Sequence, residues 1–181
     1  MTRNPSPEAA RGARVKRVLL FGLLALLLAT AQCSFFAELH ICPATPDLIL
    51  SLTVAVLLLD SVYSAAVVAI GAGFLVDALG ATSLFLSPLF YFAVVLILCV
   101  PASKMLTSFP SYLLLMLPAL ILRAAYTVAC FWLMAGPMPA MSHVGGVLAR
   151  EAIVTAILCL PIYPTVKLFR LPLLAKSRFR F

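Results

Sequence analysis

Apolar stretches of about 20 residues recur along the whole chain, and they restrict its fold more than any other feature. A helix of that length rises roughly 30 Å, the thickness of the hydrocarbon core of a bilayer. Hydrophobic residues make up 64% of the 181 residues, and charged residues only 10%. A soluble domain of this size could not bury so much apolar surface, and the alternating strands of an outer-membrane barrel are absent. The sequence therefore predicts an all-α, polytopic membrane protein.

Six transmembrane helices joined by short loops account for the apolar runs. The second and third runs follow one another directly, so we expect two short helices there, with a turn at Asp60–Ser61 and Ser64 as a helix cap. The loop between the fifth and sixth helices is expected at 136–146. The expected spans are 18–37, 47–61, 64–79, 87–102, 111–135 and 147–168.

The start of the first run, residues 15–33, resembles a secretory signal peptide. A basic start leads into an apolar core that ends at Cys33. A lipoprotein cleavage site needs a small residue before the cysteine, whereas Gln32 stands here, and the apolar run continues through Phe35 and Phe36. We interpret this segment as a retained first helix.

Basic residues gather at the two ends of the chain and produce its net charge of +7. Five Lys or Arg residues precede the first span, five lie at or after the end of the last, and Lys104 lies in a loop on the same side. The opposite loops contain none, and only Arg150 lies near that side. The positive-inside rule then places both termini in the cytoplasm.

The chain should therefore consist of a basic N-terminal segment (1–17), a six-helix membrane domain (18–168) and a basic tail (169–181). Basic segments beside a membrane attract anionic lipid. No motif supports nucleic-acid binding. The candidate basic contact residues are Arg14, Lys16, Arg17, Arg170, Lys176, Arg178 and Arg180.

No catalytic, cofactor-binding or metal site is expected. The chain lacks a phosphate-binding loop, a zinc-protease motif and a nucleophile elbow. The two histidines, His40 and His143, fall in loops without a neighbouring acidic cluster. The five cysteines lack paired metal spacing, so we interpret them as apolar fillers, with a Cys33–Cys42 disulfide as the less favoured alternative.

Charged residues inside the apolar runs are the strongest site candidates, because an ionised group in hydrocarbon is costly unless it is paired. Asp60 is expected in a solvated turn, and Glu151 near the membrane interface. Asp77 and Arg123 lie roughly 20 Å and 18 Å from the cytoplasmic starts of their helices, so they should share a depth. We expect an Asp77–Arg123 ion pair, more structural than catalytic, with Glu151 as the alternative partner of Arg123.

Small residues form a second candidate site around Asp77. Ala69, Gly73 and Asp77 are four residues apart and fall on one helix face, with Gly80 close by. Small residues at this spacing let another helix approach closely. This face could pack within the bundle or against the transmembrane helix of a partner.

Two segments carry a resemblance to a known family. The second helix enters through PDLILSLTVAVL (46–57), and the third ends in GFLVDALG (73–80). With the basic start, the three further helices and the basic tail, the chain resembles the rod shape-determining MreD family of bacteria. The resemblance covers nearly the whole chain in length and topology.

The resemblance implies a non-enzymatic scaffold of the cell-elongation machinery, located in the bacterial inner membrane. Its expected partners are MreC and, through it, MreB filaments, the RodA glycosyltransferase and its transpeptidase, besides membrane lipids. The resemblance thus makes the candidate basic contact residues candidate lipid or filament contacts. The family's fold is similar to the substrate-binding subunits of energy-coupling-factor vitamin transporters. A substrate-binding transporter subunit is therefore the alternative function, and no bound cofactor is expected for the scaffold.

Overall fold

The fold is a bundle of helices arranged around one short central helix. The computed structural model describes residues 7–35, 46–80, 86–135 and 141–178, and this part of the chain is helical without any strand. The all-α prediction is therefore confirmed. The elements are α1 (Pro7–Thr30), the π-helical turn η1 (Ala31–Phe35), α3 (Leu48–Leu59), α4 (Val62–Leu79), α5 (Ser87–Lys104), α6 (Phe109–Ala135) and α7 (Met141–Arg178).

Five segments are long and apolar enough to cross a membrane. They are Val15–Phe35, Val62–Leu79, Ser87–Lys104, Phe109–Cys130 and Gly145–Phe169. Each lies within a few residues of an expected span, and together they indicate a multi-pass membrane protein. The remaining expected span corresponds to α3, which has only 12 residues. At about 1.5 Å per residue α3 rises roughly 18 Å, well short of the hydrocarbon thickness.

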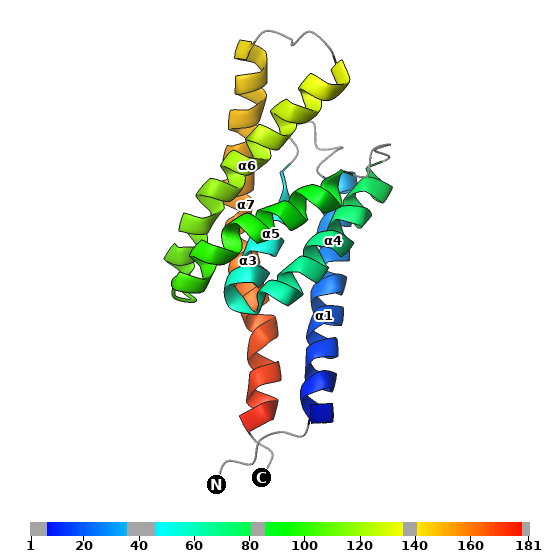
Figure 1. Ribbon diagram of the computed structural model, residues 1–181, viewed down its shortest axis with the longest axis vertical. Helices are drawn as coiled ribbons and strands as arrows, with labels where there is room; N and C mark the ends of the chain where they lie inside the picture. The colour runs from blue at the N-terminus through cyan, green and yellow to red at the C-terminus, as the bar shows by residue number, and fades with distance from the viewer. Residues whose placement is uncertain (1–6, 36–45, 81–85, 136–140, 179–181) are drawn as a thin grey trace.

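The short helix α3 is the core of the bundle. All of its residues are buried, and it contacts α1, α4, α5, α6 and α7. Its sequence, LILSLTVAVLLL, is apolar on every side, as expected for a helix that is enclosed all round. Figure 1 shows the other helices around it, with the start of α1 and the end of α7 at the same end of the molecule and the α6–α7 hairpin reaching furthest at the other.

Helices α4 and α5 make the most extensive contact in the bundle. Gly73 is the point of closest approach, because a Cβ atom there would lie 2.5 Å from Cα of Pro88. Ala69, Gly73 and Asp77 are all buried, whereas Gly80 is exposed and ends α4. The small-residue face is therefore used for packing within the bundle, and its buried part is closed to a partner helix.

Several helix ends differ from those expected from the sequence. The expected loop 136–146 is helical from Met141, because α7 continues through Gly145 and Gly146. Glycine lowers helix propensity by only about 1 kcal/mol, which an apolar helix paired with a neighbour can tolerate. The cap of α4 is Ser61 rather than Ser64, since the Ser61 hydroxyl accepts a hydrogen bond from the Ser64 backbone N–H at 3.2 Å.

A candidate functional site at the N-terminus of the central helix

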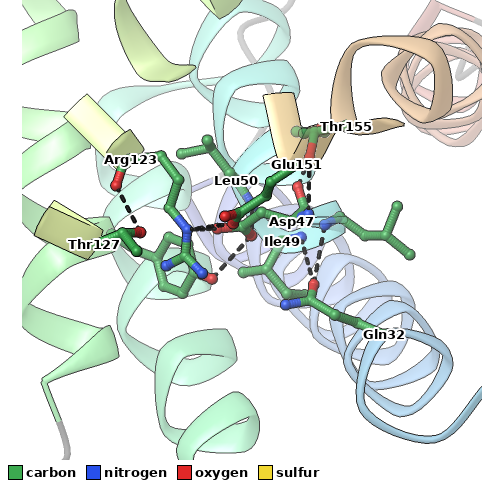
Figure 2. A network of polar contacts seen from close by, with 11 residues as sticks. Gln32, Asp47, Ile49, Leu50, Arg123, Thr127, Glu151 and Thr155 are labelled. Atoms are coloured by element: carbon green, nitrogen blue, oxygen red, sulfur yellow. Dashed lines mark hydrogen bonds and ion pairs between the residues drawn. The ribbon is translucent and has the colours of Figure 1, made fainter. Parts of the chain in front are cut away.

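The first turn of α3 is buried, so its backbone N–H groups need acceptors from the protein rather than from water. Asp47 caps the helix, because its Oδ1 accepts from the backbone N–H of Leu50 at 2.9 Å. Gln32 supplies the other acceptor from η1: its Oε1 lies 3.0 Å from the N atom of Leu48 and 3.4 Å from that of Ile49. Figure 2 shows the Gln32 amide directed at this helix end.

Asp47 also connects α3 to three other helices. Its Oδ1 accepts from the Tyr91 hydroxyl of α5 at 2.9 Å, and its backbone N–H donates to Oγ1 of Thr155 on α7 at 3.0 Å. The Nε atom of Arg123, on α6, lies 3.2 Å from Oδ2. With a side-chain exposure of only 1%, this carboxylate is held entirely by protein groups.

Arg123 is shared between two carboxylates. Its Nε lies 3.1 Å from Oε1 of Glu151, to which it donates a hydrogen bond, and 3.2 Å from Oδ2 of Asp47. The geometry at Asp47 Oδ2 is that of an ion pair without a hydrogen bond, and this oxygen has no hydrogen-bond donor in the described part of the chain. One N–H group therefore serves two acids, as Figure 2 shows, and satisfies only one of them fully.

Aromatic rings support the guanidinium of Arg123. Its central carbon lies 5.6 Å from the ring centroid of Phe90 and 5.7 Å from that of Tyr126, within the range of cation–π attraction. The two rings stack on each other at 4.4 Å between centroids. The rings and the two acids together fix a charged side chain inside the bundle.

The cluster lies inside the apolar segments rather than at their ends. Arg123 is seven residues from Cys130, the end of its candidate span, and Glu151 is six residues from Gly145, the start of the next. Both counts place the cluster about 10 Å inside the apolar region, on the side away from the chain ends. A cavity of about 20 Å³ borders the cluster, lined by Arg123, Glu151 and Thr155 among others, and has room for about one water molecule.

The ion pairs of Arg123 differ from the expected Asp77–Arg123 pair. Arg123 contacts Glu151, the alternative partner, together with Asp47. Asp77 is buried near the end of α4, where its Oδ2 accepts from the backbone N–H of Ser87 at the start of α5, at 3.1 Å. Position along a helix does not determine which neighbour a side chain faces.

Asp60 is another acid whose surroundings differ from the expectation. It was expected in a solvated turn, yet its side chain is only 7% exposed and its Oδ1 lies 3.0 Å from Nη1 of Arg17. Arg17 is one of the candidate lipid or filament contacts, so this ion pair uses one of those charges within the bundle. It joins the basic start of α1 to the turn between α3 and α4.

The other candidate basic residues that the structure describes belong to the start of α1 or the end of α7. Lys16 is exposed on α1. The positions of Arg14, Arg170, Lys176 and Arg178 are on the helical backbone of α1 or α7. Arg180, His40 and Cys42 lie outside the described residues. No group of histidine, cysteine or acidic side chains suited to a metal ion occurs in the described ranges.

Sequence reasoning missed Asp47, Tyr91 and Thr155 as members of the cluster. A signal for Asp47 was present, because an aspartate directly before an apolar helix and after Pro46 is a typical N-cap. Nothing in the sequence marks Tyr91 or Thr155, since a single hydroxyl in an apolar helix commonly bonds its own backbone. Their role depends on how the helices are rotated against one another.

The fold and this cluster define a helical, multi-pass membrane protein with a buried polar centre. No protein-family model, curated protein or solved structure matches the chain. Its function therefore has to be inferred from its own residues.

Proposed function

We propose that the chain is a non-enzymatic scaffold of the bacterial cell-elongation complex and acts as an MreD protein of the inner membrane. In this function it binds MreC and, through it, links MreB filaments to the RodA glycosyltransferase and its transpeptidase, which maintains the rod shape. The proposal starts from the resemblance of residues 46–57 and 73–80 to that family.

One structural observation supports a scaffold above the other functions. Most of the buried polar side chains in the described part of the chain contact other protein groups, while the outer faces of the helices are apolar. Exposed residues such as Leu19, Leu23 and Leu27 on α1, or Leu96 and Ile97 on α5, offer only lateral hydrophobic contacts. Such a surface is suited to lateral contacts with other membrane helices as well as with lipid.

The proposed topology has six crossings with both termini in the cytoplasm. The start of α1 and the end of α7 share one end of the molecule, and Lys16 lies exposed on this part of α1. Basic residues are enriched on the cytoplasmic side of membrane proteins. In this topology α3 is the sixth crossing, made by a helix that is too short to span the bilayer alone and is enclosed by the other five.

The first test is affinity purification of the tagged full-length chain from gently solubilised membranes of its source bacterium, with mass spectrometry of the proteins recovered. The control is an unrelated tagged multi-pass protein expressed at the same level. Recovery of MreC with the RodA–transpeptidase pair, absent from the control, is the expected result. Recovery of a transporter ATPase with its coupling subunit would contradict the scaffold and favour the transporter.

The second candidate function, a substrate-binding subunit of a small-molecule transporter, draws on the buried polar cluster and on the family's similarity to such subunits. Drug-sized ligands need pockets of about 300 Å³ or more, and the polar cavity beside Glu151 measures about 20 Å³. A larger open hollow of about 740 Å³ runs along α6, but its lining from Ile121 to Trp132 is apolar. The polar groups and the available volume therefore do not coincide, which makes this candidate the weaker of the two.

A further inference from the structure

We propose that Asp47 and Glu151 together hold one proton, so that the buried cluster is electrically neutral. The inference rests on the number of charges around Arg123 and on the hydrogen bonds that its Nε can make. It does not depend on the partners proposed above.

The cluster contains more acid than base. When ionised, Asp47 and Glu151 carry two negative charges, and both converge on the single positive charge of Arg123. In the described part of the chain, the other polar or titratable groups that face the cluster are uncharged. They are Gln32 and Cys33 of η1, Tyr91 of α5, Tyr126 of α6 and Thr155 of α7.

An excess negative charge at this position is unfavourable. The cluster lies about 10 Å inside the apolar segments, and Asp47 is fully buried. A buried group without a counter-charge is neutralised rather than left ionised, and of two carboxylates that share a site one is favoured to stay protonated. Binding one proton removes the excess charge without any other chemical change.

The hydrogen bonds point to the same answer independently. Arg123 Nε–H bonds to Glu151, and Asp47 Oδ2 is left as a buried oxygen without a donor. An unsatisfied buried acceptor costs about as much as a lost hydrogen bond. Asp47 Oδ2 is therefore the less well satisfied of the acidic oxygens and the favoured place for the proton. The proton comes from water, and the cavity beside Glu151 has room for about one water molecule.

Infrared spectroscopy of the full-length protein in a detergent without ester groups tests the proposal, because a protonated carboxylic acid has a C=O stretching band that a carboxylate lacks. We expect this band at neutral pH with the intensity of about one carboxyl group. Glu151→Gln and Asp47→Asn should each abolish it, since either change leaves one carboxylate for one guanidinium. Asp77→Asn, which changes a buried acid outside the cluster, is the matched control and should retain the band.

Absence of the band from the wild-type protein, or its persistence in both cluster variants, would overturn the proposal. If a variant does not fold, a second measurement, made on the wild-type chain alone, tests the proposal. If the folded state holds one proton more than the unfolded state, the equilibrium constant for folding should fall about tenfold per pH unit as the pH rises from about 5, where carboxyl groups of the unfolded chain are already ionised, to neutral. A folding equilibrium that is independent of pH in this range would also contradict it.

Discussion

Replacement of Gly73 by alanine tests whether the contact between α4 and α5 determines the stability of the bundle. The added Cβ would lie 2.5 Å from Cα and 2.6 Å from N of Pro88, and 3.0 Å from the carbonyl carbon of Ser87. Favourable carbon contacts begin at about 3.5 Å, so one helix must move by about 1 Å. The neighbouring atoms are backbone, and no side-chain rotation can relieve the clash.

The expected cost follows from three contributions. Overpacking of this kind costs about 1–3 kcal/mol. The movement also stretches the hydrogen bond from Ser87 N–H to Asp77, now 3.1 Å, which contributes about 1 kcal/mol. Alanine regains up to about 1 kcal/mol of helix propensity. We therefore expect Gly73→Ala to lower the free energy of unfolding by about 2 kcal/mol.

Gly71 provides a matched control in the same helix. A Cβ there would have no heavy atom within 4 Å, so Gly71→Ala should be neutral or stabilise by up to about 1 kcal/mol. Both variants and the wild-type chain would be unfolded in the same mild detergent by denaturant, with helix content followed by circular dichroism. Equal stabilities of the two variants would refute the close approach of α4 and α5.

Three further predictions concern the central helix and use the same unfolding assay. Arg123→Leu leaves two buried acids without a cation and should lower the free energy of unfolding by about 3–5 kcal/mol; a loss below about 1 kcal/mol would mean that the ion pairs contribute little. Asp47→Ala should be about 1 kcal/mol less stable than Asp47→Asn, because only asparagine keeps the cap on Leu50 N–H; equal stabilities would contradict that cap. Thr53→Val should stabilise the protein by about 1 kcal/mol, since the buried Thr53 hydroxyl has no hydrogen-bond partner among the described residues, and any destabilisation would show that the hydroxyl is satisfied.

The helices could be predicted from the sequence because hydropathy alone marks them. Runs such as Val62–Leu79 and Ser87–Lys104 are bounded by serine, proline and charge, which are signals that depend on neighbouring residues only. The start of α7 was harder to predict from the sequence than the ends of these helices. Gly145 and Gly146 resemble a loop in the sequence, but they continue a helix whose stability comes from packing and length.

The members of the cluster could be predicted only in part. Arg123 and Glu151 stand out as charges in apolar runs, and their contact was foreseen as an alternative. Whether Asp77 or Glu151 pairs with Arg123 depends on the rotation of each helix about its axis. This rotation is set by long-range packing, such as the approach of Gly73 to Pro88, which directs Asp77 towards Ser87. A single sequence contains the residues but not these angles.

The charged cluster follows from the length of α3. A helix that rises roughly 18 Å cannot place both ends in water when it is enclosed in a bundle that spans roughly 30 Å. Its N-terminal N–H groups therefore need acceptors inside the protein, which Gln32 and Asp47 provide. An ionised cap in turn requires a cation, and Arg123 at that depth attracts the second acid, Glu151. Lengthening α3 at its N-terminus by one turn would carry the cap towards water, and the need for Arg123 should then weaken. On this reasoning the cluster first serves to end a short helix inside a membrane, and any proton it holds is a consequence of that architecture.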